Sequence, residues 1–236
     1  MGQALVDFET KVDSLIRDDA GILTLKEKDL MIQDASRRYS ADRPLIKVHD
    51  YLGDGAAYDF DLPTDFIPGF SGVTGLEYPL GEGREPTLLE AEDWALYRTM
   101  ENNEQKIKLR VIEVTPAAGK KLRLTYATLH AIPVSGAGTI PDSDFDAVAA
   151  LAASLCCRAL AAKYAQTSEP TLSADVVNYQ GRAAQYGDLA NQLLKIYQDY
   201  IGLSKEPGGP AASVTKDLDT SLSFGGDFLF HRRKWR

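Results

Sequence analysis

The sequence predicts an α+β protein: a helical bundle into which a small antiparallel β-sandwich or barrel is inserted, followed by an extended C-terminal arm. Apolar residues recur at helical spacing near the N-terminus and again from Val148 onward. Between these regions, from about 45 to 133, apolar and polar residues alternate as they do in strands. The predicted boundaries are 1–43 and 141–202 for the bundle, 44–140 for the β domain, 203–220 for a flexible linker and 221–236 for the arm.

The N-terminal region is expected to contain two helices. The apolar positions of the first helix are Leu5, Phe8, Val12, Leu15 and Ile16, and the run 18–21 (DDAG) ends it. Thr24 and Glu27 have the spacing of a capping box, which predicts the start of a second helix that continues through Arg38. Pro44 follows, and the periodicity changes there.

Strand signals fill the middle of the chain. LIKVHDYL and YDFDLP alternate apolar with polar residues, with a turn at 53–55 between them. VTGLEYPL, KIKLRVIEV and KLRLTYATL follow, separated by turns that contain Gly and Pro. Short strands at this spacing predict a small antiparallel sandwich or barrel.

Two long helices are expected after the strands. The first is Ala-rich, is capped by Ser143 and Asp146, and ends near Gln166; the second starts near Ser173 and ends at Gly202. Steps of three and four residues give the second helix a continuous seam, which can pack on the preceding helix or on another copy of the chain. The seam consists of Val176, Tyr179, Ala183, Tyr186, Ala190, Leu193 and Tyr197.

The overall charge argues against general DNA binding. The net charge is −8, with 26 basic and 34 acidic residues, and four of the basic residues lie in the last six positions. The rest of the chain is therefore more acidic still and should repel a phosphate backbone. The adjacent Cys156 and Cys157 are expected to be free, buried thiols, because neighbouring helical side chains diverge. No secretory signal and no stretch of 18 apolar residues is found, so no membrane partner is expected.

A search for catalytic patterns predicts a protein that is not an enzyme and that binds no metal or cofactor. His49, His130 and His231 form no metal-binding pair, and no nucleophile elbow or Walker sequence is present. GEGREP at 81–86 begins like a dinucleotide fingerprint, but Pro86 stands where the third Gly is needed, so we interpret it as a hairpin loop.

Acidic residues in the first strands are the remaining candidate for chemistry. Alternation places Asp59 and Asp61 on one face and Tyr58, Phe60 and Leu62 on the other. A solvated sheet face is the simplest interpretation, and a calcium site is the alternative. A carbohydrate site that uses these carboxylates with Trp94 and Tyr97 is a further hypothesis. The cluster consists of Asp50, Asp54, Asp59, Asp61 and Asp65.

The order of these segments resembles the head-to-tail connector (adaptor, or neck) proteins of tailed bacteriophages, and is similar to podovirus gatekeeper-type tail tubular proteins. RRYSADRP closes the second helix, and the resemblance continues through DGAAYDFDLPTDFIPGFSGVTGLEYPL, KLRLTYATLHAIP and the two long helices. It covers roughly residues 5–202. Leu62-Pro63, the acidic-aromatic-Pro sequence at 77–79 and Tyr126 recur in this order in related neck proteins.

The resemblance implies a structural role in the virion. Such proteins form a ring of identical copies, here expected to number twelve, that docks beneath the portal protein and joins the capsid to a downstream tail or nozzle protein. Genomic DNA passes through the ring without specific binding, and assembly takes place in the host cytoplasm. The C-terminal arm of the family clamps the portal.

The C-terminal arm itself has three interpretations. A solvated tail is the default for a terminus, whereas Arg and Trp could make a nucleic-acid-binding module. Alternating apolar residues favour a protein anchor that adds a strand to a partner, and Arg and Trp are common at interface hot spots. The expected portal-binding residues are Leu222, Phe224, Phe228, Phe230, Arg232, Arg233, Trp235 and Arg236.

Overall fold

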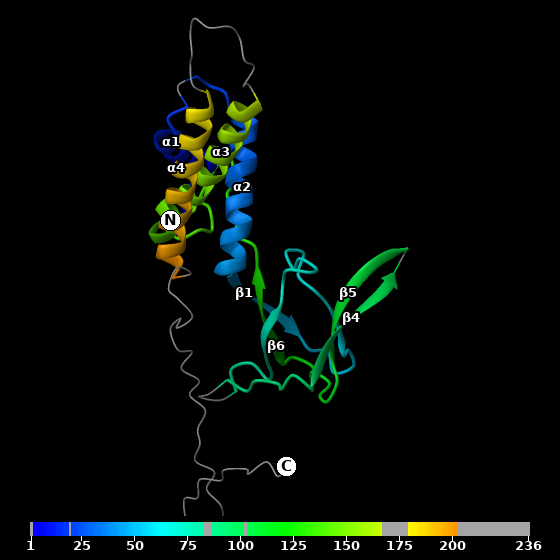
Figure 1. The fold of residues 1–236 in the computed structure, drawn as a ribbon. Coiled ribbons are helices and arrows are strands. Elements are labelled where there is room, and N and C mark those ends of the chain that lie inside the picture. Colours follow the sequence, from blue (N-terminus) through cyan, green and yellow to red (C-terminus); the bar gives the residue numbers. More distant parts are fainter. Residues whose placement is uncertain (1, 19, 83–85, 102, 167–178, 203–236) are drawn as a thin grey trace, which may run out of the picture.

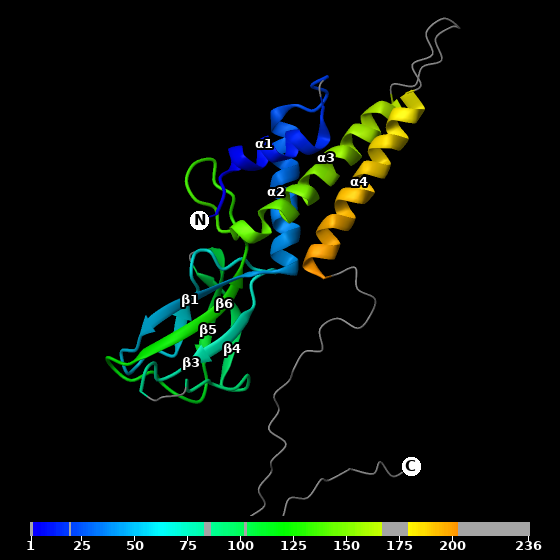
Figure 2. The same cartoon turned by 90° about the vertical axis from the view of Figure 1, so that its left-hand side faces the viewer.

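Helix α3 (Phe145–Gln166) is the centre of a helical bundle in the computed structural model, which describes residues 2–18, 20–82, 86–101, 103–166 and 179–202. Every residue from Ala147 to Cys157 is buried, because α1, α2 and α4 pack around this helix. Figures 1 and 2 show α3 running between the other helices of the bundle. The α+β fold class is confirmed.

The two N-terminal helices form as predicted. Helix α1 (Leu5–Ile16) buries four apolar residues of its expected face and ends where Arg17 takes a left-handed conformation. Helix α2 (Leu25–Asp42) begins with the predicted capping box: the Thr24 backbone amide donates to Glu27 Oε2 at 2.8 Å, and the Glu27 amide donates to Thr24 Oγ1 at 3.3 Å. This reciprocal pair satisfies two amide groups that a helix start leaves unpaired.

Helix α4 (Tyr179–Ile201) is antiparallel to α3 and lies along it (Figure 2). The predicted start near Ser173 lies outside the described residues. Gly202 ends the helix as predicted, with a φ of 86° and its amide bonded to the Gln198 carbonyl oxygen at 3.0 Å. Cys156 and Cys157 are free and buried, as expected.

One expectation about α3 is wrong. The Ser143 hydroxyl does not cap the helix; it donates to Asp144 Oδ1 at 2.8 Å, within the 3-10 turn η1 (Asp142–Asp144) that precedes α3. The segment 142–166 is long and apolar enough, by length and composition, to cross a membrane. Because 67% of its most apolar window is buried inside the protein, α3 is accounted for as a core helix.

The strands between α2 and α3 form two antiparallel sheets of three strands each. One sheet has the order β1 (Leu45–Leu52), β6 (Lys121–Thr128), β3 (Val73–Glu77); the other has the order β2 (Asp59–Asp61), β5 (Glu104–Val111), β4 (Trp94–Glu101). A small core of Leu76, Leu109, Leu122, Leu124 and neighbouring aromatic rings joins the sheets. Strand β4 was not predicted, because Arg98 and Thr99 interrupt its apolar residues.

Candidate interaction surfaces

The predicted arm lies outside the described residues, as does the linker at 203–220. This applies to all eight expected portal-binding residues, Leu222, Phe224, Phe228, Phe230, Arg232, Arg233, Trp235 and Arg236. Their role stays a prediction. The structure describes the C-terminal end of α4, after which the linker and the arm follow in the sequence.

The seam of α4 packs inside the chain over its described part. Ala190, Leu193 and Tyr197 are buried in the helical core, and Ala183 and Tyr186 are partly buried against it. The Tyr197 hydroxyl donates to Asp42 Oδ2 at 2.5 Å, which also joins α4 to the end of α2. Val176 lies outside the described residues, and Tyr179 is the first residue of α4. Of the two alternatives for the seam, its described residues therefore follow packing within the chain.

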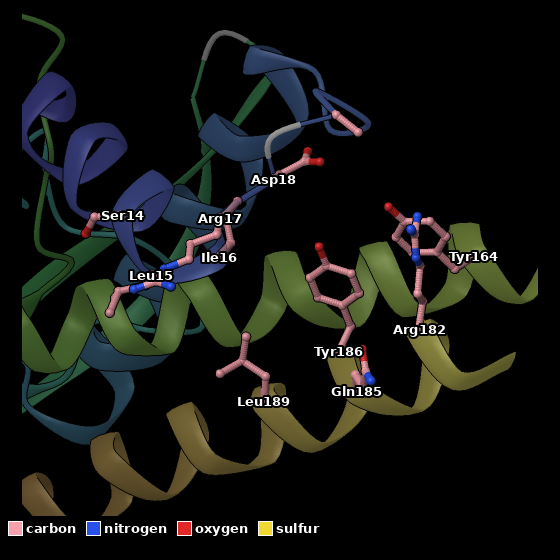
Figure 3. Close-up of a pocket in the computed structure, with 11 residues that line it drawn as sticks. Ser14, Leu15, Ile16, Arg17, Asp18, Tyr164, Arg182, Gln185, Tyr186 and Leu189 are labelled. Atoms are coloured by element: carbon pink, nitrogen blue, oxygen red, sulfur yellow. The ribbon is translucent and has the colours of Figure 1, made fainter. Parts of the chain in front are cut away.

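A hollow of about 770 Å³ lies between the end of α1 and the α3–α4 pair. The rings of Tyr164 (α3) and Tyr186 (α4) stack with 5.5 Å between their centroids and 8° between their planes. The guanidinium carbon of Arg182 lies 5.9 Å from the Tyr164 centroid. Figure 3 shows these side chains facing the same hollow as the end of α1. Burial raises the pKa of the Tyr186 hydroxyl, so this phenol stays neutral at physiological pH.

Charged groups line the rim of the hollow. Arg17 lies at the left-handed end of α1, and the Asp18 carboxylate accepts hydrogen bonds from the amides of Ile22 and Leu23 at 3.2 and 2.9 Å. Asp18 therefore holds the α1–α2 connection in place. Aromatic faces with two guanidinium groups suit an aromatic or carboxylate side chain of another protein. The described lining residues contain no His or Cys that could act as base or nucleophile.

Asp144 is the centre of a hydrogen-bond network at the junction of the bundle and the β domain. Its carboxylate accepts hydrogen bonds from the Tyr39 hydroxyl, from Arg43 Nη1 at 2.9 Å and from the Tyr200 hydroxyl at 2.8 Å. Burial alone would raise the pKa of Asp144, but these hydrogen bonds and that from Ser143 lower it to about 2. One buried carboxylate thus ties the end of α2 to the last turn of α4.

His130 strengthens the same junction from the β-domain side. Its ring packs at a tilt of 51° against Tyr39, with 5.0 Å between the centroids, Nε2 lies 3.1 Å from the Arg43 carbonyl oxygen, and its backbone amide donates to Ser40 Oγ at 2.9 Å. Burial lowers the pKa of the His130 imidazole, which favours the neutral ring. Both chain connections of the β domain, at Arg43 and at His130, are therefore held against α2.

The acidic residues of the β domain are paired with cations on neighbouring strands. Asp50 forms a bidentate pair with Arg123 at 2.7 and 2.9 Å, and Asp59 forms one with Arg110 at 2.7 and 2.8 Å. Asp65 pairs with Lys47 at 2.7 Å. These guanidinium partners lower the pKa of Asp50 and Asp59. The predicted solvated sheet face thus becomes a set of cross-strand ion pairs, and Asp54 instead accepts from the amides of Ala56 and Ala57.

The proposed carbohydrate site is not assembled. Trp94 and Tyr97 lie on opposite faces of β4: Trp94 packs against the β core, whereas Tyr97 lies on the face of Asp59 and Arg110. Tyr58 was expected on the Phe60 side, but its ring lies 5.0 Å from the Arg110 guanidinium on the Asp59 side. Because the two rings do not form one aromatic surface, the structure gives the carbohydrate hypothesis no geometric support.

The described histidines lie apart from one another. His49 packs edge-on against Tyr51 at 4.6 Å, His130 lies at the junction, and His231 is outside the described residues. Within the part of the chain that the structure describes, no group of three His, Cys, Asp or Glu residues could hold a metal ion.

Comparisons with known proteins find a distant similarity to a solved structure. No family model matches the chain, and no curated protein is similar to it. The chain is similar to one in a solved structure described as "Neck of native GTA particle computed with C12 symmetry", with 13% identity and a TM-score of 0.26, over 79% of this chain and 93% of that chain. A TM-score this low does not establish a shared fold, so the function must be argued from this chain's own residues.

Proposed function

We propose that this chain is a non-enzymatic head-to-tail adaptor of a tailed phage, located in the neck of the virion. Twelve copies form a ring below the portal protein, join the capsid to a downstream tail or nozzle protein and line the channel through which genomic DNA passes. The observation that carries the proposal is the arrangement of the helices. The β domain is inserted between α2 and α3. Helix α4, the last described helix of the bundle, precedes the linker and the arm in the sequence.

The junction network supports the arm's role as a portal anchor. The Tyr200 hydroxyl bonds to the Ser143 carbonyl oxygen at 2.7 Å and to Asp144 Oδ1 at 2.8 Å, two residues before Gly202 ends α4. The end of α4, after which the linker and then the arm follow in the sequence, is therefore held against the turn before α3 and, through Asp144, against the end of α2. A flexible segment on a fixed attachment point raises the effective concentration of its binding residues near a docked partner.

The charge distribution supports a channel role. The chain without its last six residues is strongly acidic, and this excess of negative charge discourages DNA from binding to the wall. Basic residues are concentrated at the extreme C-terminus, where the proposal has them pair with acidic groups of the portal.

A truncation tests the proposal directly. Removing 217–236 should abolish binding to the portal protein encoded in the same genome, measured by co-sedimentation of purified proteins. Far-UV circular dichroism should show an unchanged helical signal, because the deleted residues lie beyond the bundle. Portal binding by the truncated protein at full-length affinity would contradict the anchor.

The matched control separates charge from apolar anchoring. Replacing Phe224, Phe228 and Phe230 by Ser keeps every basic residue, whereas replacing Arg232, Arg233 and Arg236 by Gln keeps every aromatic ring. We expect the Phe variant to lose more affinity than the Arg variant, because exposed charge pairs contribute less than buried aromatic side chains.

A nucleic-acid-binding module is the second candidate, because four of the last six residues are basic and Trp235 lies among them. Gel shifts with duplex and single-stranded DNA over a salt series distinguish the two. Absence of retardation at low salt would remove this candidate, whereas retardation that disappears with the arm would favour it over the portal anchor.

A further inference from the structure

The β4–β5 hairpin has one apolar face that continues beyond the β core. Pairs directly opposite each other in an antiparallel ladder share a face. The ladder pairs Leu96 with Leu109, Arg98 with Ile107 and Met100 with Gln105. Leu109 is buried in the β core, but toward the tip of the hairpin the same face becomes exposed, with Leu96 at 37% and Met100 at 67% exposure.

The outer part of this hairpin lacks a third strand over its described residues. Strand β2 covers β5 only from Lys108 to Arg110, so the outer residues pair only with each other. Figure 1 shows the hairpin extending away from the rest of the β domain. A two-stranded ribbon is marginally stable in water unless its apolar face packs against another surface.

A second apolar surface lies on the other sheet. Ile46, Val48 and Leu52 alternate along β1 and are 51%, 57% and 65% exposed. Their ladder partners on β6 are Ala127, Thr125 and Lys121, so the outer face of this sheet is apolar around Ile46 and Val48. No described segment of the chain covers this face. Strand β1 is also an edge strand, where exposed aliphatic residues usually mark an interaction site.

The two surfaces lie on opposite sides of the β domain. In Figure 1 β1 and β6 lie on the left and the hairpin extends to the right; in Figure 2, viewed from that left side, β1 and β6 lie in front of β4 and β5. The hairpin face therefore cannot reach the β1 face of its own chain, but it can reach that of another copy.

We propose that the apolar face of the β4–β5 hairpin of one copy packs on the outer β1–β6 face of the next copy. Each copy then gives its hairpin to one neighbour and receives the hairpin of the other, which is the heterologous contact that closes rings. The receiving face also offers acceptors for a cation. Arg98 is exposed on the hairpin face, and the receiving face carries Asp50 and Glu77 on either side of Arg123, with Lys121 at the Leu52 end of the same face.

This inference rests on the proposed function only in that copies of the chain assemble; it assigns the contact to the β domain, whereas the α4 seam packs within the chain. The contact needs no portal, DNA or arm. It therefore predicts self-association of the purified chain alone, and portal binding through residues 217–236 is a separate property.

The experiment is light scattering coupled to size-exclusion chromatography of the full chain. We expect the wild type to self-associate, and Met100→Asp and Val48→Lys each to weaken self-association at least about tenfold, because each places a charge in an apolar contact. At a concentration at which the wild type is monomeric, thermal unfolding of both variants should be unchanged, since both positions are exposed in the single chain.

Matched controls use the adjacent residue, which points to the opposite face. Thr99→Asp places its carboxylate opposite Lys106, and His49→Lys places its ammonium group in the hollow that Asp61 and Asp65 line. Both should assemble like the wild type. The inference is overturned if Met100→Asp and Val48→Lys associate as strongly as the wild type, or if the wild type stays monomeric. Neither result affects the portal co-sedimentation test.

A disulfide test gives a second measurement. The double variant Val48→Cys, Met100→Cys should form a ladder of covalent oligomers on a non-reducing gel, and a mixture of the two single variants should form dimers only. The native Cys156 and Cys157 are fully buried and do not contribute. A ladder confirms the heterologous contact; monomers alone, from a variant that also elutes as a monomer, contradict it.

Discussion

The helical bundle and the β domain of this chain differ in how far each completes its own packing. In the bundle, eleven consecutive residues of α3 are buried by helices of the same chain. In the β domain, Ile46, Val48, Leu52 and Met100 remain more than half exposed around a core of nine buried residues, and they lie on two faces. The bundle also leaves Val6, Leu25, Leu30 and Ile196 more than half exposed, but these residues are spread over α1, α2 and α4. A region that buries its apolar surface internally can act as a rigid support, whereas a region that leaves such surface exposed is suited to contact other molecules. The predictions below test this difference, from the largest expected effect to the smallest.

Leu160→Ala should be the most damaging of these changes. Leu160 is fully buried between α3 and its neighbours, and a central helix packed on all sides cannot move to fill the cavity. We expect a loss of about 4 kcal/mol in the free energy of unfolding, measured by urea denaturation followed by circular dichroism. Ile196→Ala is the control, because Ile196 is 54% exposed on α4. An equal loss in both variants would contradict the central position of α3.

Asp144→Asn tests the hydrogen-bond network at the end of the bundle that lies next to the β domain. The amide keeps the size of the carboxyl group but removes the charge that accepts from Tyr39, Arg43 and Tyr200. We expect a loss of about 2 kcal/mol in the free energy of unfolding, measured by urea denaturation. The control is Asp146→Asn, since the Asp146 side chain is 76% exposed in its pair with Lys11 and should change stability by less than about 0.5 kcal/mol.

The pH dependence of stability should distinguish the same two variants. The folded-state pKa of Asp144 is lowered to about 2, from an ordinary value of 3.8, so its charged form stabilises the fold above pH 3.8. That contribution is lost as the pH falls from about 4 to about 2. Urea midpoints over this range should fall less steeply for Asp144→Asn than for Asp146→Asn, and parallel curves would exclude the network as the cause.

Thr24→Ala should lower the free energy of unfolding by a smaller amount, because it affects only the start of α2 in the bundle. It removes the hydroxyl that accepts from the Glu27 amide at the start of α2, and N-cap losses of this kind cost about 1 kcal/mol. Thr10→Ala removes a hydroxyl from the middle of α1, where it only donates to the Val6 carbonyl oxygen, and should cost less. Hydrogen exchange at the first turn of α2 is the direct measurement.

Val48→Thr should have the smallest effect on stability. Val48 is 57% exposed and Thr retains its β-branched shape, so we expect a change of less than about 0.5 kcal/mol in thermal or urea unfolding. A substantially larger loss would show that the single chain already uses the outer β1 face in its own packing, and would remove the contrast between the two regions.

Local signals in the amino-acid sequence predict most of the helices and strands. The Thr24–Glu27 capping box, the left-handed Gly202 and the alternation in β1 and β6 each act over a few residues, and all appear in the structure. Strand β4 was missed because Arg98 and Thr99 interrupt its apolar residues, and only its pairing with β5 identifies it as a strand. The cap at Ser143 was wrong because Asp144 draws that hydroxyl into the junction network.

The candidate surfaces could be predicted from the sequence less well than the fold. The seam of α4 correctly grouped residues that share a face, but whether that face meets its own chain or another copy depends on where α3 lies. Nothing in the spacing of Tyr39, Arg43, Asp144 and Tyr200 indicates that they converge, because more than 100 residues separate the two sides of the network.

The sequence by itself determined the fold class, most of the helices and strands in their order, the start of α2, the ends of α1 and α4 and the chemical character of the C-terminus, because these depend on side-chain periodicity and on hydrogen bonds between near neighbours. Tertiary structure alone decided that α3 is surrounded, that Asp144 ties the turn before α3 to α2 and α4, and that apolar faces remain open on opposite sides of the β domain. These features depend on contacts between residues far apart in the chain, whose placement follows only when all elements pack together.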